Sequence, residues 1–251
     1  MRKYRILIIL LLLVLTAGAG TALFLWYQQD QEIKRKQRFY ETRQSASFSQ
    51  TEQELSEIPV EFDRLQKENP DVYAWLTIPG TSIDAPVLQR EGDISYYLSH
   101  DWTGQESTEG AVCSESQYNG KTFTDVHTVL YGNNCENGAL FGGLRVFEDE
   151  AFFNEHKLIA VYTPDAIRYY RIFAAYEYDS RHLLESFDCT KPKGLERYVK
   201  EIFQQRNLYA HIDDSRTVTE DDYLLTLSTG SSREKGKTYL VQGILEQTFW
   251  R

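Results

Sequence analysis

The sequence lacks an excess of basic residues, and this argues against a protein that binds nucleic acid. Its 251 residues include 27 Lys and Arg against 37 Asp and Glu, so the formal net charge is −10. A nucleic-acid-binding protein needs a basic face that displaces counterions from phosphates. We therefore expect no nucleic acid among the partners. The hydrophobic content of 41% excludes a disordered chain and is enough for one sizeable domain with an appendage.

Cysteine is scarce as well, which argues against a zinc site. The three cysteines, Cys113, Cys135 and Cys189, form neither a CxxC nor a CxxxH pair. We expect no metal and no cofactor. The thiols are either scattered structural cysteines or, if the domain lies outside a membrane, one disulfide with one cysteine left over. In the second case we predict that Cys113 pairs with Cys135.

Charge is missing from one long segment near the start of the chain. Ile6 to Tyr27 runs for 22 residues without a charged side chain. At about 1.5 Å per residue such a helix spans a hydrocarbon core of about 30 Å. The alternative is a cleaved signal peptide with its small-residue site at Ala17 to Ala19, but the apolar run continues past this site. We predict an uncleaved anchor, and basic residues on both sides of the run leave its orientation open.

The rest of the chain divides into a polar segment and a compact domain. Residues 28–68 are mostly polar and charged and predict a juxtamembrane helical stalk. Residues 69–251 contain short apolar runs separated by turn residues, which predicts a mostly β fold with helices, arranged as a largely antiparallel barrel. One amphipathic helix is expected over Gly194 to Arg206. The expected strands are 73–78, 83–88 (an edge or bulged strand, because it contains Pro86), 110–113, 126–131, 158–162, 168–178, 223–228 and 238–245.

Four blocks in this domain, taken in their order and spacing, resemble class B sortases. They read NPDVYAWLTIPGTSIDAPVLQ (residues 69–89), YYLSHDWTGQESTEGAV (96–112), TVLYGNNCENGALFGGL (128–144) and LLTLSTG (224–230). The resemblance covers about Asn69 to Leu245. It implies a sortase-like eight-stranded β-barrel on an N-terminal transmembrane signal anchor, with the N-terminus in the cytoplasm and the barrel outside a Gram-positive cell. Residues 194–206 then match the extra helix of this class.

Active members of this family cleave a sorting signal through a Cys thiolate and transfer the acyl group to an amine of the cell wall or of a pilin. The resemblance places their catalytic Cys, His and Arg at Gly230, Asn133 and Thr238, or at Lys237 with a shift of one residue. All three catalytic side chains are substituted. Glycine has no side chain that attacks a carbonyl, and Asn133 has no proton to donate near neutral pH, although its amide can fill part of the hydrogen-bonding role of an imidazole.

Other residues near these positions are candidate substitutes. Cys135 is a possible relocated nucleophile, and Lys237 or Arg233 could supply a positive charge, although a solvated loop charge is the simpler interpretation of Arg233. Thr229 and Ser231 are expected to line a substrate groove. Two histidines are not expected to act in catalysis: His100 is a turn or packing residue, and His127 lies six residues before Asn133, about 20 Å away at 3.3 Å per residue.

Two functions follow from this interpretation. The first is a membrane-anchored, catalytically inactive sortase-like protein that binds a sorting-signal peptide, a pilin or an active sortase at the cell surface. The alternative is an active cysteine transpeptidase whose catalytic groups are relocated, with Cys135 or a neighbouring serine as the nucleophile. Because function depends on the site and not on the fold, the resemblance alone does not decide between them.

Overall fold

The computed structural model describes residues 58–93 and 95–251. The described residues belong to one compact unit, residues 56–251. The predicted membrane anchor at Ile6 to Tyr27 and residues 28–57 of the predicted stalk lie outside the described residues. In the described part of the chain, the helices are too short or too polar to cross a membrane.

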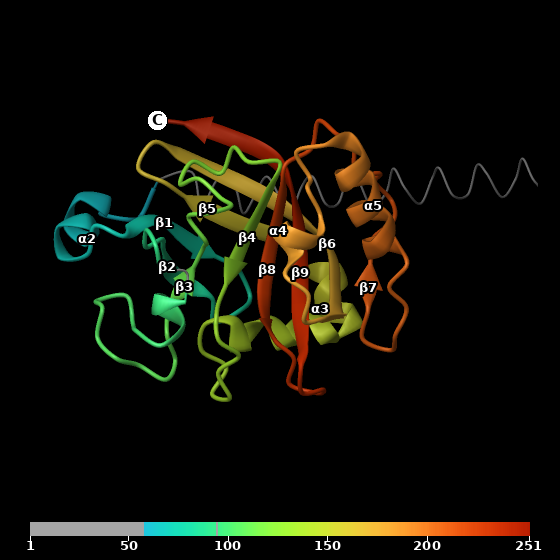
Figure 1. The fold of residues 1–251 in the computed structure, drawn as a ribbon, viewed down its shortest axis with the longest axis horizontal. Coiled ribbons are helices and arrows are strands. Elements are labelled where there is room, and N and C mark those ends of the chain that lie inside the picture. Colours follow the sequence, from blue (N-terminus) through green and yellow to red (C-terminus); the bar gives the residue numbers. More distant parts are fainter. Residues whose placement is uncertain (1–57, 94) are drawn as a thin grey trace, which may run out of the picture. The chain divides into compact units, whose positions relative to one another are not determined.

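The centre of the described unit is a closed, eight-stranded β-barrel (Figure 1). Its strands follow the order β5-β1-β2-β3-β4-β8-β9-β6, and β6 pairs back with β5 to close the sheet. The pairings β2–β3 and β4–β8 are parallel, and all other recorded pairings are antiparallel. The prediction of a mostly antiparallel eight-stranded barrel is confirmed. The strands are β1 (Val72–Thr77), β2 (Asp84–Leu88), β3 (Val112–Cys113), β4 (His127–Tyr131), β5 (Leu158–Tyr162), β6 (Ala166–Asp179), β8 (Leu224–Gly230) and β9 (Lys237–Trp250), with β7 (His211–Ile212) added beside β6.

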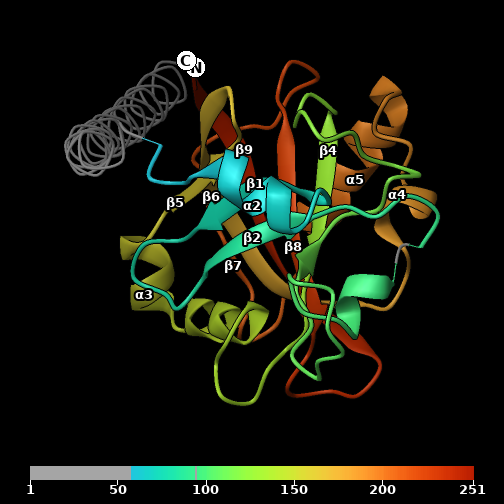
Figure 2. The same cartoon turned by 90° about the vertical axis from the view of Figure 1, so that its left-hand side faces the viewer.

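Short helices cover the ends and one flank of the barrel. Figure 2 shows α4 and α5 beside β4 and β8, and α2 next to β1 and β2. The helix predicted over 194–206 is present, but it begins earlier because Pro192 suits the first turn of a helix, where its missing N–H costs nothing. The helices are α2 (Phe62–Glu68), η1 (Tyr96–Leu98), η2 (Phe141–Glu148), α3 (Glu150–Glu155), α4 (Leu183–Ser186) and α5 (Pro192–Phe203).

Alternation along the strands sorts the side chains into two cores. In β8, Leu225 and Leu227 belong to the cluster that fills the barrel. Leu224 faces the other way and belongs to a second cluster, between the outside of the barrel and α5. Successive residues of a strand point to opposite faces, so Thr226, Ser228 and Gly230 also lie on the outer face. The outer face of β8 is therefore buried under α5 at one end and reaches the end of the strand at the other.

Pro86 is tolerated in β2 because the strand is paired on one side only at that residue. Pro86 lies opposite Trp75 of β1. On its other side, β3 pairs only with Val87 and Leu88. Proline cannot donate a hydrogen bond to a neighbouring strand. The prediction of an edge strand is wrong, because β2 lies between β1 and β3, but at Pro86 itself β2 is paired with β1 alone.

The predicted disulfide is wrong, because all three cysteines are free thiols. Cys113 is buried in a cluster with Val72 and Leu88. The Sγ atom of Cys135 lies 3.8 Å from the backbone oxygen of Glu109. A disulfide needs the two Cβ atoms to lie about 4 Å apart. Cys113 and Cys135 instead contact different parts of the protein.

Candidate functional site

The ends of three neighbouring strands bring Asn133, Gly230 and Thr238 together. Parallel strands β4 and β8 are in register up to Tyr131 and Ser228, so both end at the same edge of the barrel. Gly230, the last residue of β8, pairs with Thr238 near the start of β9. Asn133 follows β4 by two residues, on the face of Tyr131 by strand alternation. We call Asn133, Ser228, Gly230 and Thr238 the strand-end site.

Backbone and side-chain hydrogen bonds hold the turn after β4 against β8. The Gly132 N–H donates to the Ser228 carbonyl at 3.2 Å. The Thr229 hydroxyl donates to the Gly132 carbonyl at 2.7 Å, and the Asn134 amide donates to the Gly230 carbonyl at 2.7 Å. Thr229 is buried by this contact on the inner side of β8. It does not line an outer groove, contrary to the expectation from sequence.

Gly230 leaves open space at the position where the family resemblance expects a nucleophile. A methyl group built on Gly230 would meet no heavy atom within 4 Å, and the backbone is not in the left-handed region. Neither sterics nor backbone conformation therefore requires glycine here. The consequence is chemical, because no atom at this position can attack a carbonyl group.

The Asn133 side chain connects the turn after β4 to the end of η1 and to the segment between η1 and β3 by hydrogen bonds. Its Nδ2 donates to the Leu98 carbonyl at 2.7 Å and points to the Thr108 carbonyl at 3.4 Å. The nitrogen is thus occupied by backbone acceptors, and Oδ1 makes no hydrogen bond to any described residue. The sequence analysis expects this amide to fill part of the hydrogen-bonding role of an imidazole, and only the acceptor part is left open to a ligand. Asn133 offers the site a hydrogen-bond acceptor, not a donor.

The two residues that align with the family's arginine at the start of β9, Thr238 and Lys237, do not supply a free positive charge. The Thr238 hydroxyl donates to the Asp179 carbonyl at 3.0 Å. Lys237 forms an ion pair with Glu234, with Nζ and Oε2 2.5 Å apart. Strand register puts Thr238, and not Lys237, opposite Gly230. Neither side chain stands in for a guanidinium.

Arg233 is an exposed residue of the β8–β9 loop, and it is also held by an ion pair and a ring contact. Its Nε donates to Glu148 Oε2 at 3.0 Å, and its guanidinium lies 3.4 Å above the Tyr209 ring. Ser231, expected in the groove, is hydrogen-bonded through its hydroxyl to the Glu177 carboxylate. These contacts anchor the loop and leave neither side chain available to a ligand without rearrangement.

Cys135 is a poor candidate for a relocated nucleophile. Burial raises the pKa of its thiol, and the negative charge of Glu109 raises it further. Only the thiolate is strongly nucleophilic, so a raised pKa reduces the reactive fraction at neutral pH. Its Sγ also faces the Glu109 backbone oxygen. No histidine contact with Cys135 is recorded among the described residues.

The two histidines singled out from sequence are both engaged with other residues. His127 pairs in register with Leu224, at the opposite end of β8 from Gly230, and it is buried. His100 stacks on Tyr96 with ring centroids 3.8 Å apart. The register places His127 far from the strand-end site, and the absence of a catalytic role for either histidine stays a prediction. In the described ranges, no group of three or more His, Cys, Asp or Glu side chains could hold a metal ion.

Two further polar groups lie at the site: Ser228, which the sequence places beside Gly230 as a hydroxyl that flanks the site, and Arg145, which the sequence analysis missed. Ser228 is buried beside Gly230 on the same face, and its hydroxyl makes no hydrogen bond to a described residue. In the described residues, the solvent-inaccessible side-chain atoms without a hydrogen-bond partner do not include Ser228 Oγ. Because Ser228 Oγ has no partner among these residues, it is accessible to solvent. Arg145 of η2 donates from Nε to Asn134 Oδ1 at 3.0 Å. Strand alternation places Ser228 on the face of Gly230, whereas no sequence pattern connects Arg145 to the strand ends.

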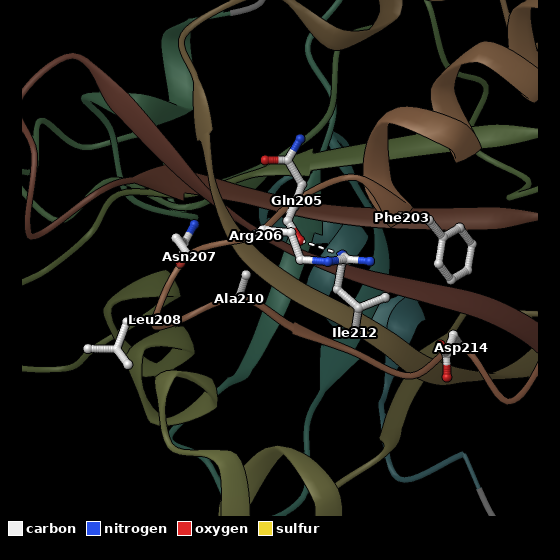
Figure 3. A pocket seen from close by; sticks show the side chains of 8 residues that line it. All are labelled: Phe203, Gln205, Arg206, Asn207, Leu208, Ala210, Ile212 and Asp214. Carbon is white, nitrogen blue, oxygen red and sulfur yellow. Dashed lines mark hydrogen bonds between the residues drawn. The ribbon is translucent and has the colours of Figure 1, made fainter.

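A separate hollow of about 720 Å³ lies between the end of α5 and β7 (Figure 3). Phe203, Arg206 and Ile212 are among its lining residues. In Figure 3 the dashed line from Arg206 is its hydrogen bond to the Gln205 carbonyl, 2.7 Å long. None of the residues of the strand-end site lines this hollow. The two features are therefore distinct.

Comparisons with known proteins agree on one family, although no family model matches the chain. Sortase B of Listeria monocytogenes is 31% identical over 193 residues, which cover 75% of each chain. A mutant form of sortase B from Clostridium perfringens superposes with a TM-score of 0.66 at 26% identity, covering 74% of this chain and 86% of the other. A class B sortase from Streptococcus pyogenes, described as involved in pilus biogenesis, superposes with a TM-score of 0.63 at 27% identity, covering 76% of this chain and 100% of the other.

Proposed function

Because this chain belongs to the class B sortase family, we propose that it binds a sorting-signal peptide and does not cleave it. The observation that carries the proposal is the open space at Gly230, at the end of β8. The scaffold around that position is intact, since the turn after β4 is hydrogen-bonded to β8 at Thr229 and at the Gly230 carbonyl. A site with its scaffold and without its nucleophile is suited to binding alone.

The side chains that peptide cleavage requires are missing from the strand-end site at each chemical step. Attack on a carbonyl needs a thiolate, and Gly230 provides none. Departure of the amine needs a proton donor, but the Asn133 nitrogen is bonded to backbone carbonyls. Stabilisation of the oxyanion needs donors at the start of β9, where the Thr238 hydroxyl is bonded to Asp179. Because the groups for three separate steps are absent, the site favours peptide binding without cleavage.

The groups that remain free suit an extended peptide. Asn133 Oδ1 is an acceptor for a peptide N–H, and the Ser228 hydroxyl both donates and accepts. An extended segment presents N–H and C=O groups in alternation. We therefore propose that a sorting signal lies across the ends of β4 and β8, and that it belongs to a surface protein, to a pilin or to a segment presented by an active sortase.

The proposed location is the cell membrane, and it rests on the sequence alone. Ile6 to Tyr27 is the proposed single-pass anchor, with the N-terminus in the cytoplasm and the barrel outside. The proposed stalk begins at residue 28 and ends before α2, because α2 packs on the barrel although the sequence analysis assigned residues 62–68 to the stalk. The test is extraction of cell membranes with alkaline carbonate, followed by protease treatment of intact cells. Release of the chain by carbonate, or protection of the barrel domain in intact cells, would contradict this location.

The function is tested by measuring binding and cleavage with the same peptides. Fluorescent peptides carrying class B type sorting signals are added to the full-length protein and to the triple variant Asn133→His, Gly230→Cys, Thr238→Arg. We expect the natural protein to bind a subset of peptides without cleaving them, and the triple variant to cleave members of that subset. Fluorescence anisotropy reports binding, and mass spectrometry of the peptide reports cleavage.

Steady cleavage by the natural protein would overturn the proposal. The variant Cys135→Ala then separates the two remaining explanations: loss of cleavage would identify Cys135 as a relocated nucleophile, and unchanged cleavage would direct attention to Ser228 and its neighbouring hydroxyl groups. Absence of any bound peptide, with the barrel folded, would leave no support for a binding role.

A further inference from the structure

Arg145 is the arginine that the structure connects to the backbone at Gly230. It lies on η2, and its Nε donates to Asn134 Oδ1 at 3.0 Å. The amide nitrogen of the same Asn134 donates to the Gly230 carbonyl at 2.7 Å. The guanidinium is thus two hydrogen bonds away from the position where the nucleophile is missing. Asn134 fixes both the strand end and the orientation of Arg145.

The terminal nitrogens of Arg145 are unoccupied within the described ranges. Arg145 forms no ion pair there and no hydrogen bond besides the one to Asn134. In the described part of the chain, the side-chain nitrogen and oxygen atoms that are inaccessible to solvent and have no hydrogen-bond partner are Lys157 Nζ, Tyr162 OH and Tyr239 OH. The terminal nitrogens of half-buried Arg145 are not among them, so they reach solvent. They carry four N–H donors in a planar arrangement.

Two other cations near the strand ends, Arg233 and Lys237, are neutralised by acidic side chains. Arg233 pairs with Glu148, and Lys237 pairs with Glu234. In a chain with a net charge of −10, acidic side chains outnumber the cations and readily pair with them. A half-buried arginine that is oriented by a neutral amide and leaves its terminal nitrogens open is different. Its charge is available to a ligand.

We propose that Arg145 binds a carboxylate of the peptide at the strand-end site. With Nε held by Asn134, the two terminal nitrogens can take both oxygens of one carboxylate end-on, which is the planar match that arginine makes better than lysine. The ligand class is a peptide with an acidic side chain or a free C-terminal carboxylate. The peptide in this inference rests on the proposed function, whereas carboxylate binding by Arg145 can be tested without a peptide.

The first test uses acetate as the carboxylate and the Nε–Hε resonances of arginine as the probe. In protein labelled with ¹⁵N at arginine, the resonance assigned to Arg145 is the one lost in Arg145→Gln. We expect acetate to shift this resonance in a saturable way, and chloride at equal ionic strength to leave it in place. The resonance of Arg64, an exposed arginine on α2 whose side chain is 80% accessible, is the internal control. Equal shifts at Arg64 and Arg145, or no shift at Arg145, would overturn the proposal.

The second test uses matched peptides from the set that binds the natural protein. One pair differs by Asp against Asn, and another by a free C-terminal carboxylate against an amide. We expect Arg145→Gln to weaken binding of the carboxylate member about tenfold and to leave the amide member unchanged, because a charge-assisted hydrogen bond is lost only with the former. Arg145→Lys should recover part of the loss, since it keeps the charge without the planar arrangement. Arg64→Gln is the control of equal charge change.

The outcomes separate this inference from the proposed function. If peptides bind and Arg145→Gln weakens both members of each pair equally, or neither, the carboxylate site is wrong while the binding function stands. If acetate binds at Arg145 and no sorting-signal peptide binds, the proposed function is wrong while the carboxylate site stands. Far-ultraviolet circular dichroism of each variant establishes that the barrel is folded before affinities are compared.

Discussion

The outer face of β4, β8 and β9 carries polar side chains at both ends of the barrel, but it uses them in opposite ways. Under α5, His127, Thr226 and Gln242 are buried and bonded to one another or to tyrosines. At the strand-end site, Asn133 and Ser228 keep polar atoms free and Gly230 leaves open space. The difference shows that the same strands carry a closed hydrogen-bond network at one end and polar groups without partners among the described residues at the other.

The closed network, which we call the α5 network, consists of His127, Thr226, Gln242, Tyr176 and Tyr198. The Thr226 hydroxyl donates its single proton to Gln242 Oε1 at 2.6 Å, so it accepts from His127 Nε2 at 2.7 Å. Gln242 Nε2 donates to the hydroxyls of Tyr176 and Tyr198 at 3.0 and 2.7 Å. Every polar atom of Gln242 is used. Complete networks of this kind stabilise one arrangement, whereas removing one member leaves others buried without partners.

The first prediction concerns acid and the α5 network. Complete burial lowers the pKa of His127 from 6.5 to about 3. Between these values the unfolded chain binds a proton that the folded protein does not, so the free energy of unfolding falls as the pH falls from about 6.5 to about 3, by roughly 4 kcal/mol. Urea unfolding across this range should give a steeper slope for the natural protein than for His127→Phe.

The matched control is His100→Gln, which removes a histidine stacked on Tyr96 outside the network. It should keep the pH slope of the natural protein. Equal slopes for His127→Phe and the natural protein would mean that His127 is protonated in the fold, and the α5 network would not be closed in the way described.

The second prediction removes the centre of the α5 network. Gln242→Leu leaves the Thr226 hydroxyl without its acceptor and the hydroxyls of Tyr176 and Tyr198 without their donor. We expect a loss of about 3 kcal/mol in the free energy of unfolding, because several buried groups lose partners at once. Urea denaturation measures it. A loss below about 1 kcal/mol would show that water or rearranged tyrosines satisfy these groups.

The third prediction makes a similar change at the strand-end site. Ser228→Ala removes a hydroxyl that bonds to no described residue, so stability should change by less than about 0.5 kcal/mol. Affinity for a bound sorting-signal peptide should fall about three- to tenfold, because one hydrogen bond to the ligand is lost. Unfolding curves and fluorescence anisotropy on the same preparation measure both. A large loss of stability would mean that the Ser228 hydroxyl is part of a buried hydrogen-bond network, as the side chains of the α5 network are.

The fourth prediction has the smallest effect and concerns the open space. Gly230→Ala meets no atom within 4 Å and needs no unusual backbone conformation, so it should stabilise the protein by roughly 0.5–1 kcal/mol through lower entropy of the unfolded chain. Gly142→Ala is the control, because a methyl there would collide with the Cys135 backbone oxygen. We expect thermal unfolding to occur at a higher temperature for the first variant and a lower one for the second.

Much of the fold could be predicted from local patterns. The β5 run from Leu158 to Tyr162 and the apolar face of α5 give clear periodicity, and both elements form close to where they are expected. The two-residue strand β7 and the 3₁₀ helix η2 were not predicted. Both are short, and their hydrogen bonds and buried faces depend on β6 and on the barrel interior. Local sequence carries little information about elements stabilised mainly by tertiary packing.

The candidate site divides in a similar way. Sequence identified Asn133, Gly230 and Thr238, and the structure brings them to one barrel end. It did not show that Arg233 is engaged by Glu148 or that Arg145 is held beside Gly230 by Asn134. These contacts cannot be derived from spacing, because a long, flexible arginine side chain can reach several partners and only the folded arrangement selects one.

The sequence by itself determined what chemistry is absent, because a glycine at position 230 and an asparagine at 133 lack a nucleophile and a titratable proton in any fold. Only the tertiary structure decided which of the remaining polar groups are free. The Asn134 amide and the Gly230 carbonyl are separated by 96 residues along the chain and meet through the parallel pairing of β4 and β8. A hydrogen bond satisfies whichever groups the fold brings within about 3 Å, so the availability of Ser228 and Arg145 to a ligand is a property of the barrel and not of the local sequence.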